Sequence, residues 1–410
     1  MGSPEPLKAS EAAAAPVSGA ERPPELAPCA LGQLLLYFLR LGALGFGGPI
    51  ALAGYMQRDL VERRRWVSQQ DYVEGLALAQ LAPGPLAAQL AMYLGWVRAG
   101  VWGASLVGVV FILPSFVMVL ALAALYVEFG GIAWMHGAFY GVGAAVIAVI
   151  ARSAYKLVRL AVARDWLLWG IFALNAGVTA WTESENVWVF LLSGVVVVLV
   201  RAPPGFGAKG GMALGLAAWP DALTSGLHGP ADGNTLGRLT WFFAKAGAFV
   251  FGSGLAIVPF LHGGAVKEYK WLNDQQFLDA VAVAMITPGP VVITAGFIGY
   301  LVAGPVGAVL AAAGVFLPCY LMVLVLAPFY RHVVKNRQIK AFVSGVTAAA
   351  TGAITGAVFV LGRRAIVDVP TALIALAALG LILSSEKVPE PVVIVAAGVV
   401  GIILTSTGLA

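Results

Sequence analysis

The chain has 410 residues, of which 60% are hydrophobic and 11% charged, with a formal net charge of +5. A soluble domain carries about 25% charged residues, so this composition excludes an ordinary soluble protein and indicates an all-α polytopic membrane protein. The positive charge does not indicate nucleic-acid binding, because the basic residues lie in short loops between apolar segments. The two cysteines and four histidines form no disulfide framework or zinc-type spacing, so we expect no metal and no cofactor.

Residues 1–30 are rich in Pro, Ala and Glu and lack an apolar stretch, so we expect a disordered tail and not a cleaved signal. Apolar segments follow at 31–57, 71–96, 99–127, 131–152, 165–181 and 186–200. A Gly- and Pro-rich polar linker covers 201–235, and further apolar segments lie at 236–262, 277–301, 303–330, 340–362, 369–384 and 390–408. We therefore expect an N-terminal repeat at 31–200 and a C-terminal repeat at 236–410.

The two sets of segments are copies of one another. The triplet Pro83-Gly84-Pro85 recurs as Pro288-Gly289-Pro290, 205 residues later, and Phe and Trp residues around it recur at the same offset. After a one-residue deletion the offset becomes 204, and Leu113-Pro114 matches Leu317-Pro318. Matches of Trp, Phe and Pro arise rarely by chance in this composition, so the sequence predicts two homologous halves.

Loop charge predicts how the halves are oriented. The loop at 127–137 contains no Lys or Arg, whereas its counterpart at 330–340 holds four. By the positive-inside rule, these equivalent loops lie on opposite faces of the membrane. We therefore expect an inverted-topology repeat with about 10 crossings, plus two broken or re-entrant helices at the Pro-Gly-Pro motifs.

The two Pro-Gly-Pro triplets, here called the first wedge (83–85) and the second wedge (288–290), predict a substrate site. Proline lacks a backbone N–H and glycine tolerates unusual torsions, so each wedge ends a helix. Broken helices are tolerated at membrane depth only where they are buried in protein or line a wet cavity. We therefore expect substrate contacts at Pro83, Gly84, Pro85, Pro288, Gly289 and Pro290.

Arg40 and Lys245 are repeat equivalents, each about ten residues into an apolar segment. A cation at such depth costs ~2.5–3.5 kcal/mol on insertion scales and usually faces a cavity or a partner. We expect the two charges to converge on one anion, assisted by unwound backbone at Gly45, Gly47, Gly48 and Gly252. The alternative is that both cations extend to an interface or pair with buried carboxylates.

Glu74 and Asp279 are also equivalent, nine residues before each wedge, and are candidates for carrying a coupling proton. Helix capping at the interface explains them equally well. Gln80, Gln89, Thr287 and Thr294 can donate hydrogen bonds to an oxyanion, with helix packing as the alternative for each. The stretch GFGAKG at 205–210 fits a dinucleotide fingerprint but follows a membrane segment, so we interpret it as a loop.

The stretch FGGPIALAGYMQRDLVERRRWVSQQDYVEGLALAQLAPGP resembles the signature region of the chromate ion transporter family. A degenerate copy runs from FGSGLAIVPF to MITPGP, with Ser253-Gly254 in place of the second Gly-Pro. The resemblance covers residues 31–408. It implies a multi-pass carrier of the bacterial inner membrane that exports chromate, coupled to protons, and confers chromate resistance.

Alternatives stay open at this point. Sulfate is a near-isosteric dianion, and an anion channel would share the broken helices and the cations. An intramembrane enzyme would need a buried catalytic constellation, and we find no His-Asp, Ser-Lys or metal cluster in the sequence, so we expect no enzyme. The expected partners are an inorganic oxyanion, the lipid bilayer and a second copy of the chain, with no nucleic acid.

Overall fold

The computed structural model describes residues 26–407 apart from 47, 130–132, 163–164, 184–186, 203–224, 227–228, 231, 250–256, 330–335 and 385–387. Most of the expected N-terminal tail and linker therefore lies outside the described residues. Two short strands, β1 (Ser225–Gly226) and β2 (Gly229–Pro230), pair antiparallel. The described helices are α1 (Leu31–Leu44), α2 (Gly48–Met56), η1 (Gln57–Arg63), α3 (Gln69–Leu81), α4 (Leu86–Phe129), α5 (Ala133–Ala161), α6 (Trp166–Thr182), α7 (Val187–Arg201), α9 (Gly233–Phe249), α10 (Ile257–His262), η3 (Gly263–Glu268), α11 (Asp274–Ile286), η4 (Val291–Ile293), α12 (Thr294–Leu326), η5 (Ala327–Phe329), α14 (Arg337–Ala365), α15 (Val369–Ser384) and α16 (Glu390–Ser406).

The first apolar segment forms a helical hairpin and not one long helix. α1 ends at Leu44, Gly45 is extended, and α2 starts at Gly48 with a φ of 76° that favours glycine. The amide of Ala27 donates to the carbonyl oxygen of Arg65 at 2.9 Å, which brings the two outer ends together. In the second half, α9 and α10 likewise replace the expected continuous segment 236–262, and the residues between them, 250–256, lie outside the described part.

A second hairpin carries the first wedge at its tip. α3 has 13 residues, and the wedge connects it to the first segment of α4. Gly75 of α3 lies against the ring of Tyr93, so the two helices run side by side in opposite directions. A 13-residue helix is about 20 Å long, shorter than the ~30 Å of hydrocarbon that a crossing helix spans.

The bounds of α4 include a tight turn at Ala99 and Gly100, which divides it into two helical segments. Ala99 (φ −148°, ψ 31°) and Gly100 (φ 57°) are not helical, and an added side chain on Gly95 or Gly103 would overlap the other's carbonyl group. The segments 86–98 and 101–129 therefore pack tightly as a second antiparallel pair. α12 repeats this turn at Ala303 (φ −145°, ψ 31°) and Gly304. The agreement in torsion angles extends the sequence repeat to the backbone.

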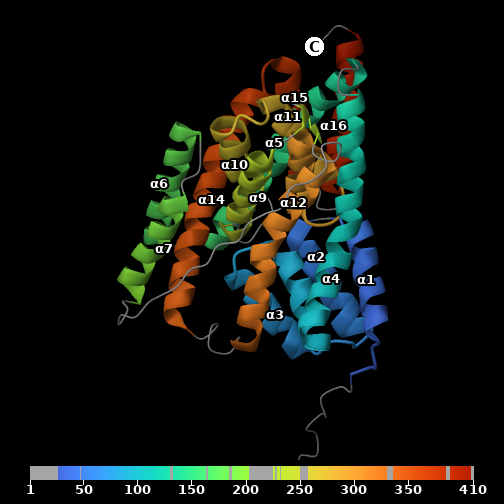
Figure 1. Ribbon diagram of the computed structural model, residues 1–410. Coiled ribbons are helices and arrows are strands. Elements are labelled where there is room, and N and C mark those ends of the chain that lie inside the picture. The colour runs from blue at the N-terminus through green and yellow to red at the C-terminus, as the bar shows by residue number, and fades with distance from the viewer. Residues whose placement is uncertain are drawn as a thin grey trace, which may run out of the picture.

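The two halves exchange their last helices. α6 and α7 pack against α14 of the second half, and α15 and α16 pack against α5 of the first half (Figure 1). Glycines permit this close approach: an added side chain on Gly352 would overlap the carbonyl of Phe172, and one on Gly141 that of Ala397. Most of the buried apolar residues of both halves form one continuous core.

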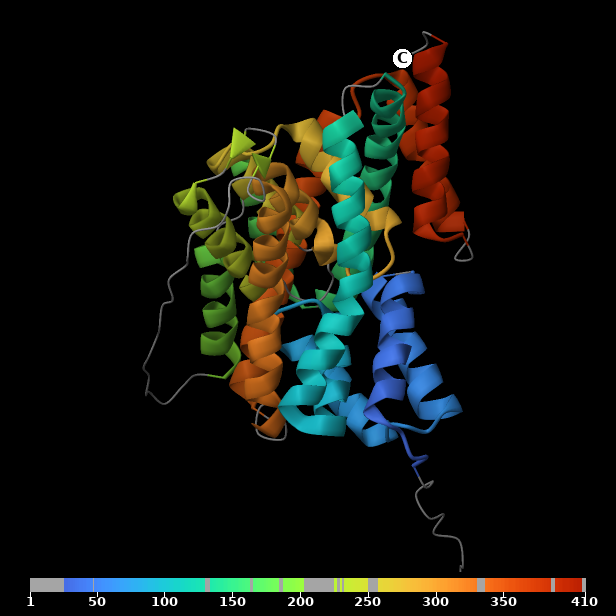
Figure 2. The same cartoon turned by 45° about the vertical axis from the view of Figure 1, so that its right-hand side comes forward.

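The long helices of the two halves run in opposite directions. In both views the longer segment of α4 (101–129) rises from the end that holds α1–α3, whereas the longer segment of α12 (305–326) descends from the end that holds α9–α11 (Figures 1 and 2). The hydroxyl groups of Ser105 and Tyr320 lie 2.6 Å apart, although Ser105 is early in the segment 101–129 of α4 and Tyr320 late in the segment 305–326 of α12.

Within the described residues, four helices are long and apolar enough to cross a membrane: Leu86–Phe129, Trp134–Arg159, Val291–Phe329 and Arg337–Ala365. Shorter apolar helices lie at Leu31–Leu44, Trp188–Arg201, Val369–Ser384 and Glu390–Ser406. The chain is therefore an all-helical protein of membrane type, apart from the short β1–β2 pair. The count of about ten crossings stays a prediction.

Candidate functional site

The second wedge lies against the first half of the molecule. The amide of Gly289 donates a 3.0 Å hydrogen bond to the carbonyl oxygen of Gly45, in the break between α1 and α2. Gly289 has a φ of 99°, and an added side chain would overlap the hydroxyl oxygen of Ser115 in α4. The break after α1 and the second wedge therefore meet at the junction of the two halves.

The first wedge makes the equivalent contact with the second half. Gly84 has a φ of 135°, and an added side chain would overlap the Cβ of Cys319 in α12. Ser115 and Cys319 are repeat equivalents at the offset of 204. Each wedge thus lies against the long helix of the opposite half. We did not predict either residue from the sequence, although both directly follow the matched Leu-Pro pairs and could have been identified from them.

The wedges are closed to solvent in this conformation. Pro83 is half-buried, and the remaining wedge residues are buried, namely Gly84, Pro85, Pro288, Gly289 and Pro290. Five of the six wedge residues are therefore shielded from solvent.

One buried polar group at the first wedge lacks a partner. Gln89 is fully buried and donates through Nε2 to the carbonyl oxygen of Pro83 at 2.6 Å. Its Oε1 is buried and has no hydrogen-bond partner among the described residues, which is costly in an apolar interior. Thr287 and Thr294 donate to backbone carbonyls of their own segments, and Gln80 is exposed. Of these four residues, Gln89 is the one with a buried side-chain atom that has no partner among the described residues, and that atom is an acceptor.

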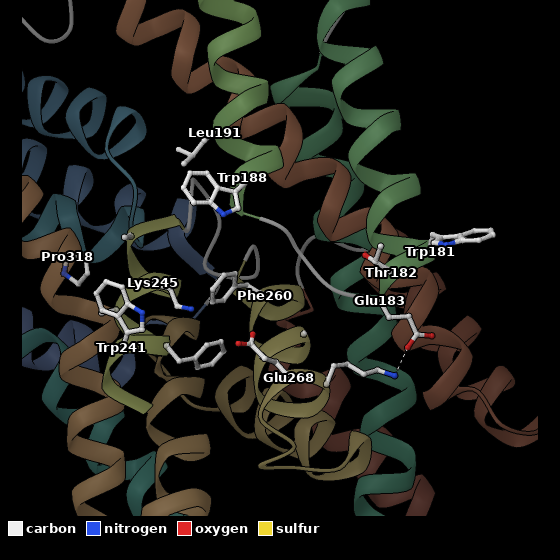
Figure 3. Close-up of a pocket in the computed structure, with 16 residues that line it drawn as sticks. Trp181, Thr182, Glu183, Trp188, Leu191, Trp241, Lys245, Phe260, Glu268 and Pro318 are labelled. Atoms are coloured by element: carbon white, nitrogen blue, oxygen red, sulfur yellow. Dashed lines mark ion pairs between the residues drawn. The ribbon is translucent and has the colours of Figure 1, made fainter. Parts of the chain in front are cut away.

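The two predicted cations occupy different environments. Lys245 is half-buried and lines a cavity of about 1080 Å³ between α6–α7 and α9–α10 (Figure 3). Aromatic side chains form much of its wall, among them Trp188, Trp241 and Phe260. Arg40 is exposed and is not among the residues that line this cavity. The convergence of the two charges on one anion stays a prediction.

The predicted glycines are only partly described. Gly45 is buried and accepts the bond from the second wedge, and Gly48 adopts its positive φ in open space. Gly47 and Gly252 lie outside the described residues.

The predicted proton carriers share a local arrangement but differ in burial. Glu74 accepts from Gln70 at 3.0 Å and Asp279 accepts from Gln275 at 2.9 Å, each donor four residues earlier on the same helix. Asp279 is 3% exposed and also accepts from the Tyr126 hydroxyl at 2.7 Å.

Glu74 is more exposed than Asp279, and its contact with the Tyr93 hydroxyl, at 3.4 Å, stays within its own half. The Asp279 contact, in contrast, joins the two halves, because Tyr126 lies on α4. Sequence reasoning did not identify Tyr126.

Comparison of the sequence with known proteins identifies its family. The sequence model of the family described as Chromate transporter matches residues 32–198 and again residues 237–402. The chain is 61% identical over 373 residues to a protein of Cupriavidus metallidurans named chromate transport protein, covering 91% of this chain and 93% of the relative. It is 57% identical to a probable chromate transport protein of Synechococcus elongatus (92% and 96% covered) and 33% identical to a chromate transport protein of Pseudomonas aeruginosa (91% and 92% covered). No solved structure matches the chain significantly.

Proposed function

The chain belongs to the chromate transporter family, and on that premise we propose that it carries chromate across the bacterial inner membrane and exports it from the cytoplasm. The observation that carries the proposal is the meeting of the two wedges with the opposite halves, at Gly289–Gly45 and Gly84–Cys319. A carrier needs a site at an interface that can open to either side, and interrupted helices at such an interface provide it. Family membership supports transport and argues against an enzyme.

We propose that the two halves form an inverted repeat. Support comes from the opposite directions of α4 and α12, and from α1–α3 and α9–α11 entering at opposite ends (Figure 2). Alternating access then follows from movement of one half against the other, with the wedges at the centre. The expected export direction and chromate resistance belong to the same proposal.

The proposed anion contacts are the wedge backbone, the break at Gly45 and the charges of Arg40 and Lys245. A dianion that crosses an apolar region needs compensating positive charge. The unpartnered Oε1 of Gln89 accepts hydrogen bonds and cannot donate them, so it suits a water or a protonated oxyanion near the first wedge. Asp279, with Tyr126, is the stronger candidate for the coupling proton because it is buried at an inter-half contact.

Flux measurements test the proposed function. The purified chain is reconstituted in proteoliposomes, and chromate and sulfate fluxes are measured with and without an imposed pH gradient. We expect saturable chromate flux that accelerates when protons are driven in the opposite direction. Large uncoupled currents would instead indicate a channel, and sulfate flux without chromate flux would identify another anion as substrate.

A further inference from the structure

A group of charged side chains from both halves lies at one end of the cavity that holds Lys245. Glu183, directly after α6, belongs to the first half, and Lys267 in η3 and Arg364 at the end of α14 belong to the second. Nζ of Lys267 lies 2.7 Å from Oε2 of Glu183, and the Arg364 guanidinium binds the same oxygen. One carboxylate oxygen therefore holds two cations (Figure 3 shows the Lys267 pair).

The backbone holds Glu183 in this position at a cost. Glu183 has a φ of 52°, a left-handed conformation that costs a non-glycine residue roughly 1–2 kcal/mol. Its amide caps α6 by donating to the carbonyl oxygen of Thr179 at 2.9 Å. The two other described non-glycine residues with positive φ, Arg65 and Lys270, are repeat equivalents of each other. The counterpart of Glu183 at the repeat offset, Lys387, lies outside the described residues, so the repeat does not account for this conformation within the described part of the chain.

The repeat does not explain the charged group either. At the repeat offsets, Lys267 corresponds to Glu62 and Arg364 to Leu160, so the first half cannot form the same pair of cations. A contact needed only to build the repeated fold would be expected in both halves. The arrangement is specific to the end of the molecule where α9–α11 enter.

The chemistry of the group suits a tetrahedral oxyanion. An ammonium and a guanidinium that share one oxygen form charge-assisted hydrogen bonds, the kind that sulfate-like oxygens accept. The Lys267 hydrogen bond, together with the charge of Arg364, lowers the pKa of Glu183, so its carboxylate is charged at neutral pH. The Glu183 side chain is 36% and the Lys267 side chain 42% exposed, so an anion reaches both from solvent.

Asp274 balances part of the positive charge. Its Oδ1 binds Arg364 and lies 2.8 Å from Nε2 of His262, so Arg364 stays oriented when Glu183 leaves. Within the described part of the chain Lys267 pairs with no second carboxylate, and its release from Glu183 would free a cation that faces the cavity. Exposed ion pairs are weak, and a dianion carries twice the charge of the carboxylate it replaces. The exchange is therefore energetically accessible.

We propose that Lys267 and Arg364 form an outer binding site for a tetrahedral oxyanion, that the Glu183 carboxylate occupies this site in the absence of the anion, and that the cavity leads from it to Lys245. This inference rests on the proposed function in one respect: the ligand is the class of anion that the protein transports. Occupation of this site by the anion displaces Glu183 and so loosens a contact between the halves.

Binding of radiolabelled sulfate to the full-length protein in lipid nanodiscs tests the site without requiring transport. Glu183→Gln removes the competing charge, and we expect it to tighten sulfate binding about fivefold. Glu268→Gln is the matched control, because Glu268 lines the same cavity and the change in net charge is identical. We expect less than about a twofold effect for the control. Lys267→Gln should weaken binding about tenfold or more, with Lys267→Arg close to wild type.

Equal sulfate affinities for Glu183→Gln and Glu268→Gln would overturn the proposal, as would wild-type binding by Lys267→Gln. A uniform elution profile in size-exclusion chromatography excludes misfolding as the cause, and Glu183→Asp, which keeps the charge, should bind sulfate close to wild type. Chromate flux in proteoliposomes is measured separately. A wild-type protein that binds sulfate through Lys267 yet moves no chromate would contradict the proposed function and leave the outer site standing.

Discussion

The amide of Gly289 in the second wedge donates a hydrogen bond of 3.0 Å to the carbonyl oxygen of Gly45, which ends α1 in the other half of the molecule. Both groups belong to interrupted helices, where the backbone has lost its own intrahelical partners. The bond therefore satisfies two interrupted segments at once and ties the halves together at the predicted site. Any relative movement of the halves must break this bond or carry both segments along.

Gly289→Ala should disrupt that junction. The new methyl group would overlap the Ser115 hydroxyl, and the φ of 99° is unfavourable for alanine. Overpacking and torsional strain together cost roughly 2–5 kcal/mol, so we expect a lower unfolding temperature and loss of chromate flux. Gly32→Ala is the control, because Gly32 has open space around it, and it should retain both properties. Normal flux through Gly289→Ala would show that the close contact is dispensable.

Replacing Pro83 and Pro85 by alanine tests the first wedge. Without the prolines, the helix after Leu81 can continue and the tip of the hairpin loses its shape. We expect normal membrane insertion but loss of chromate flux, because the change acts on site geometry. Pro114→Ala, which removes a proline inside the helix of α4, serves as the comparison and should have a smaller effect. Unchanged export by the double variant would reduce the wedge to a packing device.

The wedges and the repeat could be predicted from the sequence, because Pro-Gly-Pro triplets and matched Trp, Phe and Pro residues stand out in an apolar chain. The gap between the apolar segments 71–96 and 99–127 lies next to the observed turn at Ala99 and Gly100. The hairpin at α1–α2 was less accessible. Its glycines predicted unwound backbone, but the apolar run through 31–57 predicted one continuous segment. The local sequence pattern does not predict the hydrogen bond between Ala27 and Arg65, because tertiary packing sets this contact.

The exchange of α6–α7 and α15–α16 between halves was also invisible in the sequence. These helices are apolar and similar in length and composition, so their sequences do not predict which long helix they pack against. The glycines at 141 and 352 permit close packing but do not predict which helix packs against them. The site contacts at Ser115, Cys319 and Tyr126 were missed for the same reason, since each depends on a residue more than 150 positions away.

Orientation in the membrane is tested by accessibility. Glu128, near the end of α4, and Asn336, before α14, are both exposed, whereas the native Cys29 and Cys319 are buried. Single cysteines at positions 128 and 336 should react with a membrane-impermeant maleimide from opposite sides, position 128 from outside. The loop charges and the opposite directions of α4 and α12 both lead to this expectation. Labelling of both positions from one side would contradict the inverted repeat.

The cations should contribute unequally. Lys245 lies in the cavity and Arg40 is exposed, so removal of charge at Lys245 should cost more chromate flux. We expect a loss of at least about tenfold for Lys245→Gln, the equivalent of one charge-assisted hydrogen bond, and a milder loss for Lys245→Arg. Arg40→Gln should also reduce flux, and Arg40→Lys less so, because lysine keeps the charge but not the planar fork. Wild-type kinetics in the Arg40→Gln, Lys245→Gln double variant would discard the anion-site hypothesis.

Variants of Asp279 and Glu74 distinguish a role in proton coupling from a role in helix capping. Asp279 is 3% exposed and bonded to Tyr126 of the other half, whereas Glu74 is only partly buried. If Asp279 carries the coupling proton, Asp279→Asn should abolish the effect of a pH gradient while chromate exchange across the membrane continues.

Tyr126→Phe keeps the carboxylate but removes the 2.7 Å bond between the halves, so it should shift the pH dependence of flux without removing it. Glu74→Gln is the matched control, because it removes a carboxylate at the equivalent position of the repeat, and it should leave the response to the pH gradient intact. The measurement is chromate flux against imposed pH difference for all three variants. Equal loss of coupling in Glu74→Gln and Asp279→Asn would mean that burial at the inter-half contact does not select the proton carrier.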